Sequence, residues 1–251
     1  MKTYVHRGGE NMRTEWILPC AGLGSGLAVL LVFAGCWLAL RRRRLRIRWS
    51  AGEWMNALGF ALLPALAVFK AFEPYMGIGS VGKAVFDPLP LLPWATENGA
   101  FMSGRIELAL FLLAFLTVCL WLMIRRNDLG SRGDLLGVSM TLWAGIRTVT
   151  EGFRADSQLS FGEWRAVYLL AFAAALLWMI LWTGRRQKRI KNTSQTVIYW
   201  LVWILCTGAL WTTISGTLSV GSEIGDLAVV VGCSAARTGV ALAAGADSRK
   251  G

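Results

Sequence analysis

Long, uninterrupted apolar runs are the dominant feature of this chain of 251 residues. Runs of about 17–25 predominantly apolar residues are long enough to cross the hydrocarbon core of a bilayer as helices. They occupy residues 16–40, 54–72, 106–124, 133–149, 164–182, 197–218 and 224–246. Each run is continuous, whereas the strands of a membrane barrel alternate over about ten residues. The sequence therefore predicts an all-α, polytopic integral membrane bundle with six to seven transmembrane helices. The seventh run is the least apolar, because it contains Asp226 and Arg237.

The charge of the chain is sparse and asymmetric. Charged residues make up 16% of the chain, against about 25% in an ordinary soluble domain, which argues against a disordered chain or a cytosolic enzyme. Basic clusters at 41–48, 125–132 and 185–191 follow the first, third and fifth runs, so seven spans place all three on one side. Because Lys and Arg concentrate in cytoplasmic loops, the N-terminus is predicted to lie outside. Membrane orientation explains the net charge of +11 without nucleic-acid binding.

No separate soluble domain is evident, so residues 1–251 are interpreted as one membrane domain. The first run is followed by arginines, which is typical of a membrane anchor and not of a cleavable signal peptide. The five cysteines lie inside apolar runs, without Cys-x-x-Cys spacing and without a neighbouring His. Neither a metal site nor a disulfide framework is therefore predicted, and no cofactor is expected.

One candidate site lies near the outer end of the fourth run. Glu151 follows Arg147 at i+4 and Arg154 follows at i+7, so a continuous helix would place all three on one face. Ionisable residues inside or at the ends of transmembrane helices are costly, and they are usually paired or functional. We expect Arg147 and Glu151 to point into the bundle. The alternative is an interfacial salt-bridge cluster with no catalytic task.

Two other runs bring charges to the same outer layer. Arg105 and Glu107 begin the third run, and Lys70 lies at the end of the second. Glu107 is expected within hydrogen-bonding reach of Arg147 and Glu151. Guanidiniums bind phosphate oxygens in a bidentate manner, and a partly desolvated carboxylate can act as a base or position an arginine. The combination favours a site for a phosphate-bearing lipid.

The residues from Gly145 to Trp164 resemble the C-terminal signature of the bacterial prolipoprotein diacylglyceryl transferases. That signature reads roughly G-R-F-x-x-E-F-x-R-x-D, followed by L-S-x-x-Q-W. The matching residues are Arg147, Glu151, Arg154, Asp156, Leu159, Ser160 and Trp164. Weaker matches upstream come in the family's order, at Pro64–Ala67, Leu92–Trp94, Glu107 and Gly133–Leu135. The resemblance covers roughly residues 20–182. It divides the chain into a transferase-like core at 16–182 and additional C-terminal helices at 197–246.

The resemblance implies an activity and a location. Members of the family transfer the diacylglyceryl group of phosphatidylglycerol to the lipobox cysteine thiol of a lipoprotein signal peptide, and glycerol phosphate leaves. The implied location is the bacterial plasma membrane, with the site facing outward. On this expectation the catalytic residues are Arg147, Glu151 and Glu107. The residues expected to bind the lipid head group are Arg154, Arg105 and Lys70.

Two departures from the family pattern keep a second reading open. Cys20-Ala21-Gly22-Leu23 stands where the family has H-G-G-L, and the stretch 69–77 lacks the Arg and Asn of a further family signature. About half of the family's site is thus retained. The alternative is a non-catalytic relative that keeps the scaffold and binds phospholipid or a membrane partner. A small transporter is not supported, because the sequence shows no charge pathway across the bilayer midplane.

Overall fold

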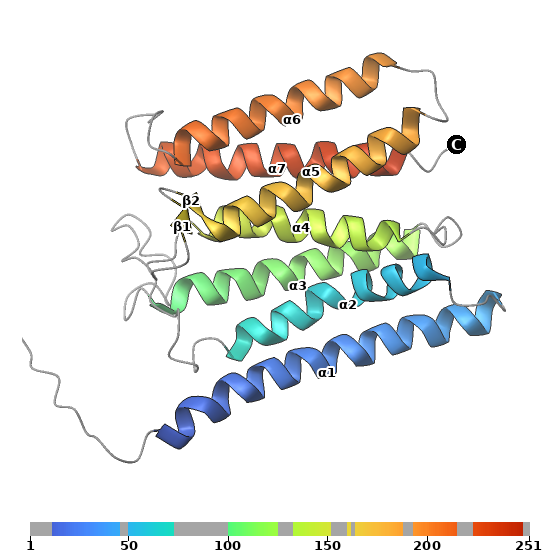
Figure 1. The fold of residues 1–251 in the computed structure, drawn as a ribbon, viewed down its shortest axis with the longest axis vertical. Coiled ribbons are helices and arrows are strands. Elements are labelled where there is room, and N and C mark those ends of the chain that lie inside the picture. The colour runs from blue at the N-terminus through green and yellow to red at the C-terminus, as the bar shows by residue number, and fades with distance from the viewer. Residues whose placement is uncertain are drawn as a thin grey trace, which may run out of the picture.

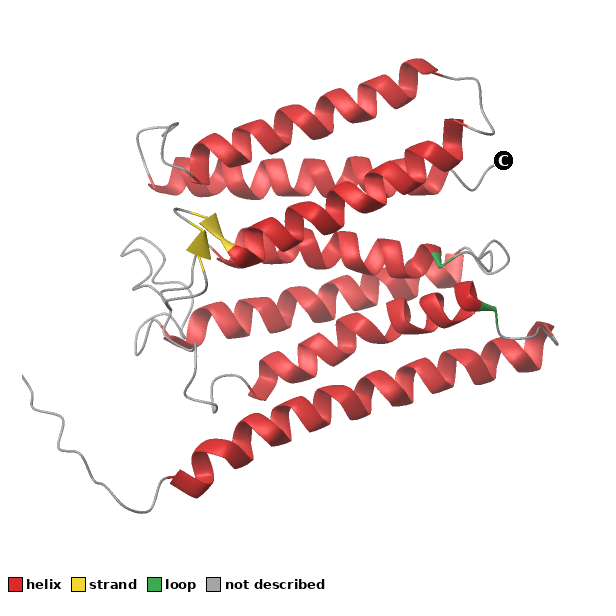
Figure 2. Ribbon diagram, viewed as in Figure 1, coloured by secondary structure: helices red, strands yellow, loops and turns green. Residues whose placement is uncertain are grey.

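The structure is a computed structural model that describes residues 12–45, 50–72, 100–124, 133–151, 160–161, 164–187, 193–214 and 223–247. Each of the seven predicted apolar runs contains a helix in the described part of the chain (Figures 1 and 2). The helices are α1 (Met12–Leu45), α2 (Ala51–Phe72), α3 (Ala100–Ile124), α4 (Asp134–Thr150), α5 (Ala166–Gln187), α6 (Thr193–Ile214) and α7 (Glu223–Asp247). The predicted all-α bundle is confirmed.

Five of these helices are long and apolar enough to cross a membrane: α1, α2, α5, α6 and α7. The apolar stretch of α3, Glu107–Leu120, is shorter, and α4 has 17 residues. Large apolar side chains cover the outside of the bundle, among them Leu31 of α1, Leu113 of α3 and Leu205 of α6. An apolar exterior of this kind suits a lipid environment and not water. The chain is therefore an α-helical membrane protein, and the crossing of all seven helices stays a prediction.

Consecutive helices run in opposite directions, so the bundle has two distinct ends (Figure 1). At the first, called the Glu107 end, α2 and α4 finish and α3, α5 and α7 begin. At the second, called the Arg185 end, α5 and α7 finish and α2, α4 and α6 begin. The helices α1 and α6 form opposite edges, α1 packing on α2 and α6 on α7. The central position belongs to α4, which contacts α2, α3, α5 and α7.

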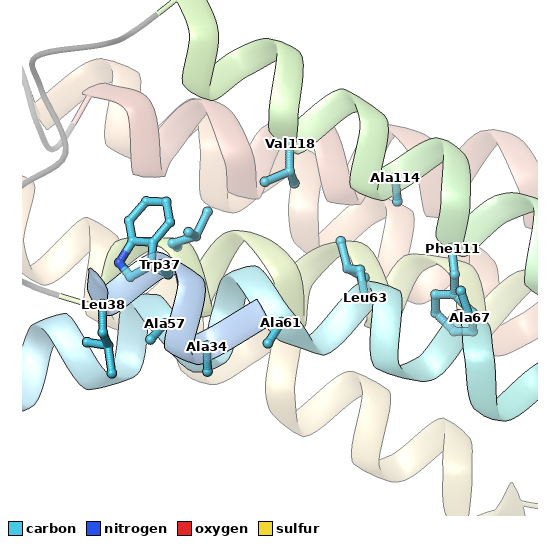
Figure 3. Close-up of a cluster of buried hydrophobic side chains, with 11 residues drawn as sticks. Ala34, Trp37, Leu38, Ala57, Ala61, Leu63, Ala67, Phe111, Ala114 and Val118 are labelled. Atoms are coloured by element: carbon cyan, nitrogen blue, oxygen red, sulfur yellow. The ribbon is translucent and has the colours of Figure 1, made fainter. Parts of the chain in front are cut away.

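Two clusters of buried apolar side chains hold the bundle together. The first joins α1, α2, α3 and the start of α4, and Figure 3 shows Ala57, Ala61 and Ala67 of α2 among side chains of α1 and α3. Small residues let helices approach closely, and close approach drives helix association in lipid. The second cluster joins α4, α5, α6 and α7. Its largest member, Trp182, is fully buried and packs against Gly137 of α4 and Gly245 of α7.

The tightest contact between two helices lies at Gly59, where α2 crosses α4. A Cβ atom placed on Gly59 would lie 2.3 Å from the backbone nitrogen of Leu136 and 2.5 Å from the carbonyl carbon of Leu135. The Ser139 hydroxyl donates a hydrogen bond of 2.6 Å to the carbonyl oxygen of Gly59. Nearby, the backbone N–H of Leu135 donates to Oδ1 of Asn56 at 3.0 Å. Backbone contact at this point requires a residue without a side chain.

We expect Gly59→Ala to separate α2 from α4 and to destabilise the protein by about 1–3 kcal/mol, the usual cost of overpacking. Backbone atoms cannot rotate out of the way as a side chain can. The matched control is Gly208→Ala on α6, where a Cβ would meet nothing within 4 Å. Since Ala is the better helix former, the control should be neutral or slightly stabilising. Thermal unfolding in detergent measures both variants, and equal melting temperatures would contradict the close contact.

One predicted helix boundary is wrong. The fifth run is predicted to become helical at residue 164, but α5 begins at Ala166. Trp164 and Arg165 form a short strand, β2, which pairs antiparallel with β1 at Ser160–Phe161. Phe161 lies opposite Trp164. This strand pairing takes the place of the first two residues of the expected helix.

Candidate functional site

Glu107 is the centre of a buried polar cluster at the Glu107 end. It lies in α3, and its side chain is fully buried. The Nζ atom of Lys70 on α2 lies 2.5 Å from its Oε2 atom. Its Oε1 atom accepts hydrogen bonds from Nη1 of Arg147 and from the hydroxyl of Thr150 on α4. Three helices that are distant in sequence therefore meet at one carboxylate.

Arg147 lies between two carboxylates. Its Nη1 donates to Glu107, and its Nη2 donates to Oε2 of Glu151 at 2.8 Å. Arg147 is 8% exposed, and Glu151 is fully buried. Glu151 is the C-cap of α4, and its backbone N–H bonds to the carbonyl oxygen of Arg147. The expectation that Arg147 and Glu151 point into the bundle and that Glu107 contacts Arg147 is confirmed, and Arg147 links Glu107 to Glu151.

The described cations beside Glu107 are Arg147 and Lys70. Lys70, predicted to bind the lipid head group, contacts Glu107 in this structure. Arg154 and the side chain of Arg105 lie outside the described part of the chain. The bonded set consists of two cations and two carboxylates, and its charges sum to zero: Lys70, Arg147, Glu107 and Glu151.

Sequence reasoning did not assign Arg237 to the site. This residue of α7 is 1% exposed. Its Nη2 donates a hydrogen bond of 3.2 Å to the hydroxyl of Thr148, the neighbour of Arg147 on α4. Its guanidinium carbon lies 4.4 Å from the ring centroid of Phe172 on α5 and 5.9 Å from that of Trp203 on α6. Four helices therefore enclose it. The signal was present, because a charged residue inside an apolar run is usually functional or paired.

The cluster lies well inside the bundle. Arg237 falls near the middle of the apolar stretch Gly225–Ala246. It is 14 positions after the first residue of α7, which is about 20 Å along a helix axis. Gly145 of α4 packs against Thr238 of α7, so α4 finishes, at Thr150, near the mid-level of α7. Because α4 is short, Arg147 and Thr148 lie deeper in the bundle than the first residues of α7.

The Arg185 end carries ion pairs of a different kind. Nη1 of Arg185 lies 2.7 Å from Oδ1 of Asp134, and Nη2 of Arg41 lies 3.0 Å from Oε1 of Glu53. Asp134 belongs to the stretch Gly133–Leu135, one of the weaker matches to the transferase pattern. In the structure it forms an ion pair with Arg185. Both pairs are at least partly accessible through their arginines. They join neighbouring helices where the bundle meets the basic segments of the sequence.

Comparison with known proteins does not assign a family. No protein-family model matches the chain, and neither the curated proteins nor the solved structures give a match. Among the described residues, no three His, Cys, Asp or Glu side chains gather as a metal-binding group. The chemistry of the site must therefore be argued from Glu107, Arg147 and their neighbours.

Proposed function

We propose that this protein binds an anionic phospholipid at the Glu107 end and transfers its diacylglyceryl group to the cysteine thiol of a lipoprotein signal peptide. The observation that carries the proposal is the buried carboxylate of Glu107, held between Lys70 and Arg147. A carboxylate placed at a reaction site can take a proton as a general base. The resemblance of residues 145–164 to the diacylglyceryl transferases supports the same reaction.

In the proposed step the thiol sulfur attacks the glycerol carbon that carries the phosphate. A sulfur–carbon bond forms, the bond from that carbon to the phosphate oxygen breaks, and glycerol phosphate leaves. The thiol proton goes to Glu107. Neutralising this carboxylate frees Lys70 and Arg147 at the moment when the leaving phosphate gains a negative charge. Cations that are already in place then stabilise the developing charge, which is a common source of catalysis.

A second candidate function rests on the occupied donors of Arg147. Two of its five N–H donors already bond to carboxylates, so a phosphate would share this guanidinium with Glu107 and Glu151. The chain also lacks the family's His at 20–23 and the Arg and Asn expected at 69–77. Under this alternative the protein is a non-catalytic relative that keeps the scaffold and binds a phospholipid or a membrane partner.

The test is a transfer assay with purified protein, vesicles of phosphatidylglycerol and a lipobox peptide. Mass spectrometry follows the peptide, which gains the mass of a diacylglyceryl group if transfer occurs. The control peptide carries Ser in place of the acceptor Cys. Transfer to the Cys peptide alone supports the transferase. Lipid binding without transfer supports the non-catalytic relative, and absence of both contradicts both functions.

We expect the Glu107 end to face outward from a bacterial plasma membrane, because α1, α3 and α5, each followed by a basic segment in the sequence, finish at the Arg185 end. Single cysteines at positions 157 and 188, in a chain whose native cysteines are replaced, provide the measurement. An impermeant thiol reagent should label position 157 in intact cells. Position 188 should be labelled only after the membrane is permeabilised. Labelling of both positions from one side would contradict the orientation.

A further inference from the structure

Arg237 is a buried cation without a bonded carboxylate among the described residues. Its described polar contact is the hydrogen bond from Nη2 to Thr148, and its Nη1 atom has no hydrogen-bond partner in the described part of the chain. Phe172 contributes a ring face instead. The guanidinium is thus held in place, while its Nη1 atom donates no hydrogen bond to the described part of the chain.

Such an arrangement is costly unless something compensates for it. A buried charge that lacks a counter-ion is strongly disfavoured. The rings of Phe172 and Trp203 and the hydroxyl of Thr148 compensate in part. The C-terminal end of α4 contributes as well, because the end of a helix carries a partial negative charge. Ring faces and a helix dipole fix the position of the cation, but none of them occupies Nη1.

The described ion pairs at the Glu107 end leave Arg237 without a bonded carboxylate. Lys70 and Arg147 contact Glu107, and Arg147 also contacts Glu151. The described polar contact of Arg237 is the neutral hydroxyl of Thr148, and its Nη1 atom has no hydrogen-bond partner in the described part of the chain. We propose that Arg237 binds a monoanion through Nη1, and that this monoanion is the phosphodiester group of the lipid substrate. The inference rests on the proposed function and names an anchor for its head group outside the transferase-like stretch 145–164.

The chemistry of Arg237 fits a phosphodiester in three ways. A phosphodiester carries a single negative charge, which matches the single positive charge of the Arg237 guanidinium. A guanidinium is less strongly hydrated than an ammonium and suits phosphate oxygens. Its contacts to Phe172, Trp203 and Thr148 immobilise it before the ligand arrives, and a preorganised donor loses less entropy on binding. A free phosphate ester shares this chemistry, so the experiment must separate the two sources.

The experiment compares wild-type protein with Arg237→Gln and Arg237→Lys. Purified protein is transferred to nanodiscs of phosphatidylcholine with increasing phosphatidylglycerol, and retained lipid is counted by native mass spectrometry. Separate arms add glycerol phosphate or inorganic phosphate. We expect phosphatidylglycerol binding to weaken at least tenfold in Arg237→Gln and several-fold in Arg237→Lys. The matched control is Arg185→Gln, which removes an arginine at the opposite end and should leave lipid binding unchanged.

Stability without ligand separates a binding role from a structural one. Removing a buried charge that has no bonded carboxylate among the described residues should leave the melting temperature of lipid-depleted Arg237→Gln unchanged or higher. Added phosphatidylglycerol should then raise the melting temperature of the wild type but not of the variant. A less stable Arg237→Gln with wild-type lipid binding overturns the inference. If Arg237→Gln does not fold, Arg237→Lys decides, and wild-type affinity in that variant also overturns it.

The outcomes for this inference and for the proposed function are distinguishable. Transfer and lipid binding that persist in Arg237→Gln leave the proposed function standing and overturn the role of Arg237. Binding of glycerol phosphate that depends on Arg237, with no lipid binding and no transfer, supports the anion site and contradicts the transferase. Wild-type protein that binds neither lipid nor phosphate overturns both.

Discussion

Replacing Glu107 with Gln should reduce diacylglyceryl transfer by about 10²–10⁴-fold, the usual contribution of a general base. Glutamine has nearly the same shape but cannot take the thiol proton. The substitution also removes the carboxylate that holds Lys70 and Arg147, so two cations lose their shared partner. The initial rate of peptide modification, measured by mass spectrometry, reports the effect. Lipid binding should persist, since the variant site carries more positive charge than the wild type.

The matched control for this prediction is Glu53→Gln. Glu53 is also a buried glutamate bonded to an arginine, but it lies at the Arg185 end and pairs with Arg41. Its replacement should leave the transfer rate unchanged. Glu151→Gln provides a graded comparison, because Glu151 is bonded to Arg147 and has no described contact with Lys70. A wild-type transfer rate in Glu107→Gln would contradict the assignment of the base.

Arg147→Met should destabilise the folded protein by about 3–5 kcal/mol, the cost of leaving buried carboxylates without their partner. Methionine retains much of the volume, so a cavity contributes little. The Nη1 and Nη2 atoms of Arg147 bond to different glutamates, and both glutamates are fully buried. Unfolding in detergent, followed by circular dichroism, measures the change. The control Arg185→Met, which breaks a more exposed pair with Asp134, should cost about 1 kcal/mol or less.

A double-mutant cycle with Glu151→Gln isolates one half of this effect. If Arg147 and Glu151 interact directly, the double variant should be less destabilised than the sum of the single variants. Contacting residues of this kind typically couple by about 0.5–3 kcal/mol. Additive changes would contradict the ion pair, and a small effect of Arg147→Met alone would indicate that the cluster is open to water.

The helices could be predicted because each of them is encoded locally. Apolar runs of membrane-spanning length mark all seven, and the structure changes their ends by a few residues. The meeting of Glu107 with Arg147 and Glu151 could also be predicted, because alternating helix directions bring the end of α4 and the start of α3 to one side. Helix spacing then places Arg147 and Glu151 on one face. Topology and periodicity are enough for these features.

Arg237 could not be placed by the same reasoning. Its contact with Thr148 joins positions 89 residues apart, and it depends on α7 packing beside α4. No local pattern states which helices become neighbours in a bundle. The contact between Lys70 and Glu107 could not be predicted either. The helix directions place both residues at one end of the bundle, but they do not say which opposite charge each residue contacts. That choice depends on how the helices pack.

The depth of Arg237 within α7 has an electrical consequence. A charge that crosses a whole membrane gains or loses about 2.3 kcal/mol per 100 mV of membrane potential. An anion that enters from outside and stops near the middle of the span experiences roughly half of that, about 1 kcal/mol, and a cytoplasm at negative potential opposes its entry. A 100 mV potential would then weaken phosphate binding by about fivefold. With the Glu107 end outside, an energised membrane would hold lipid at this site less tightly than a depolarised one.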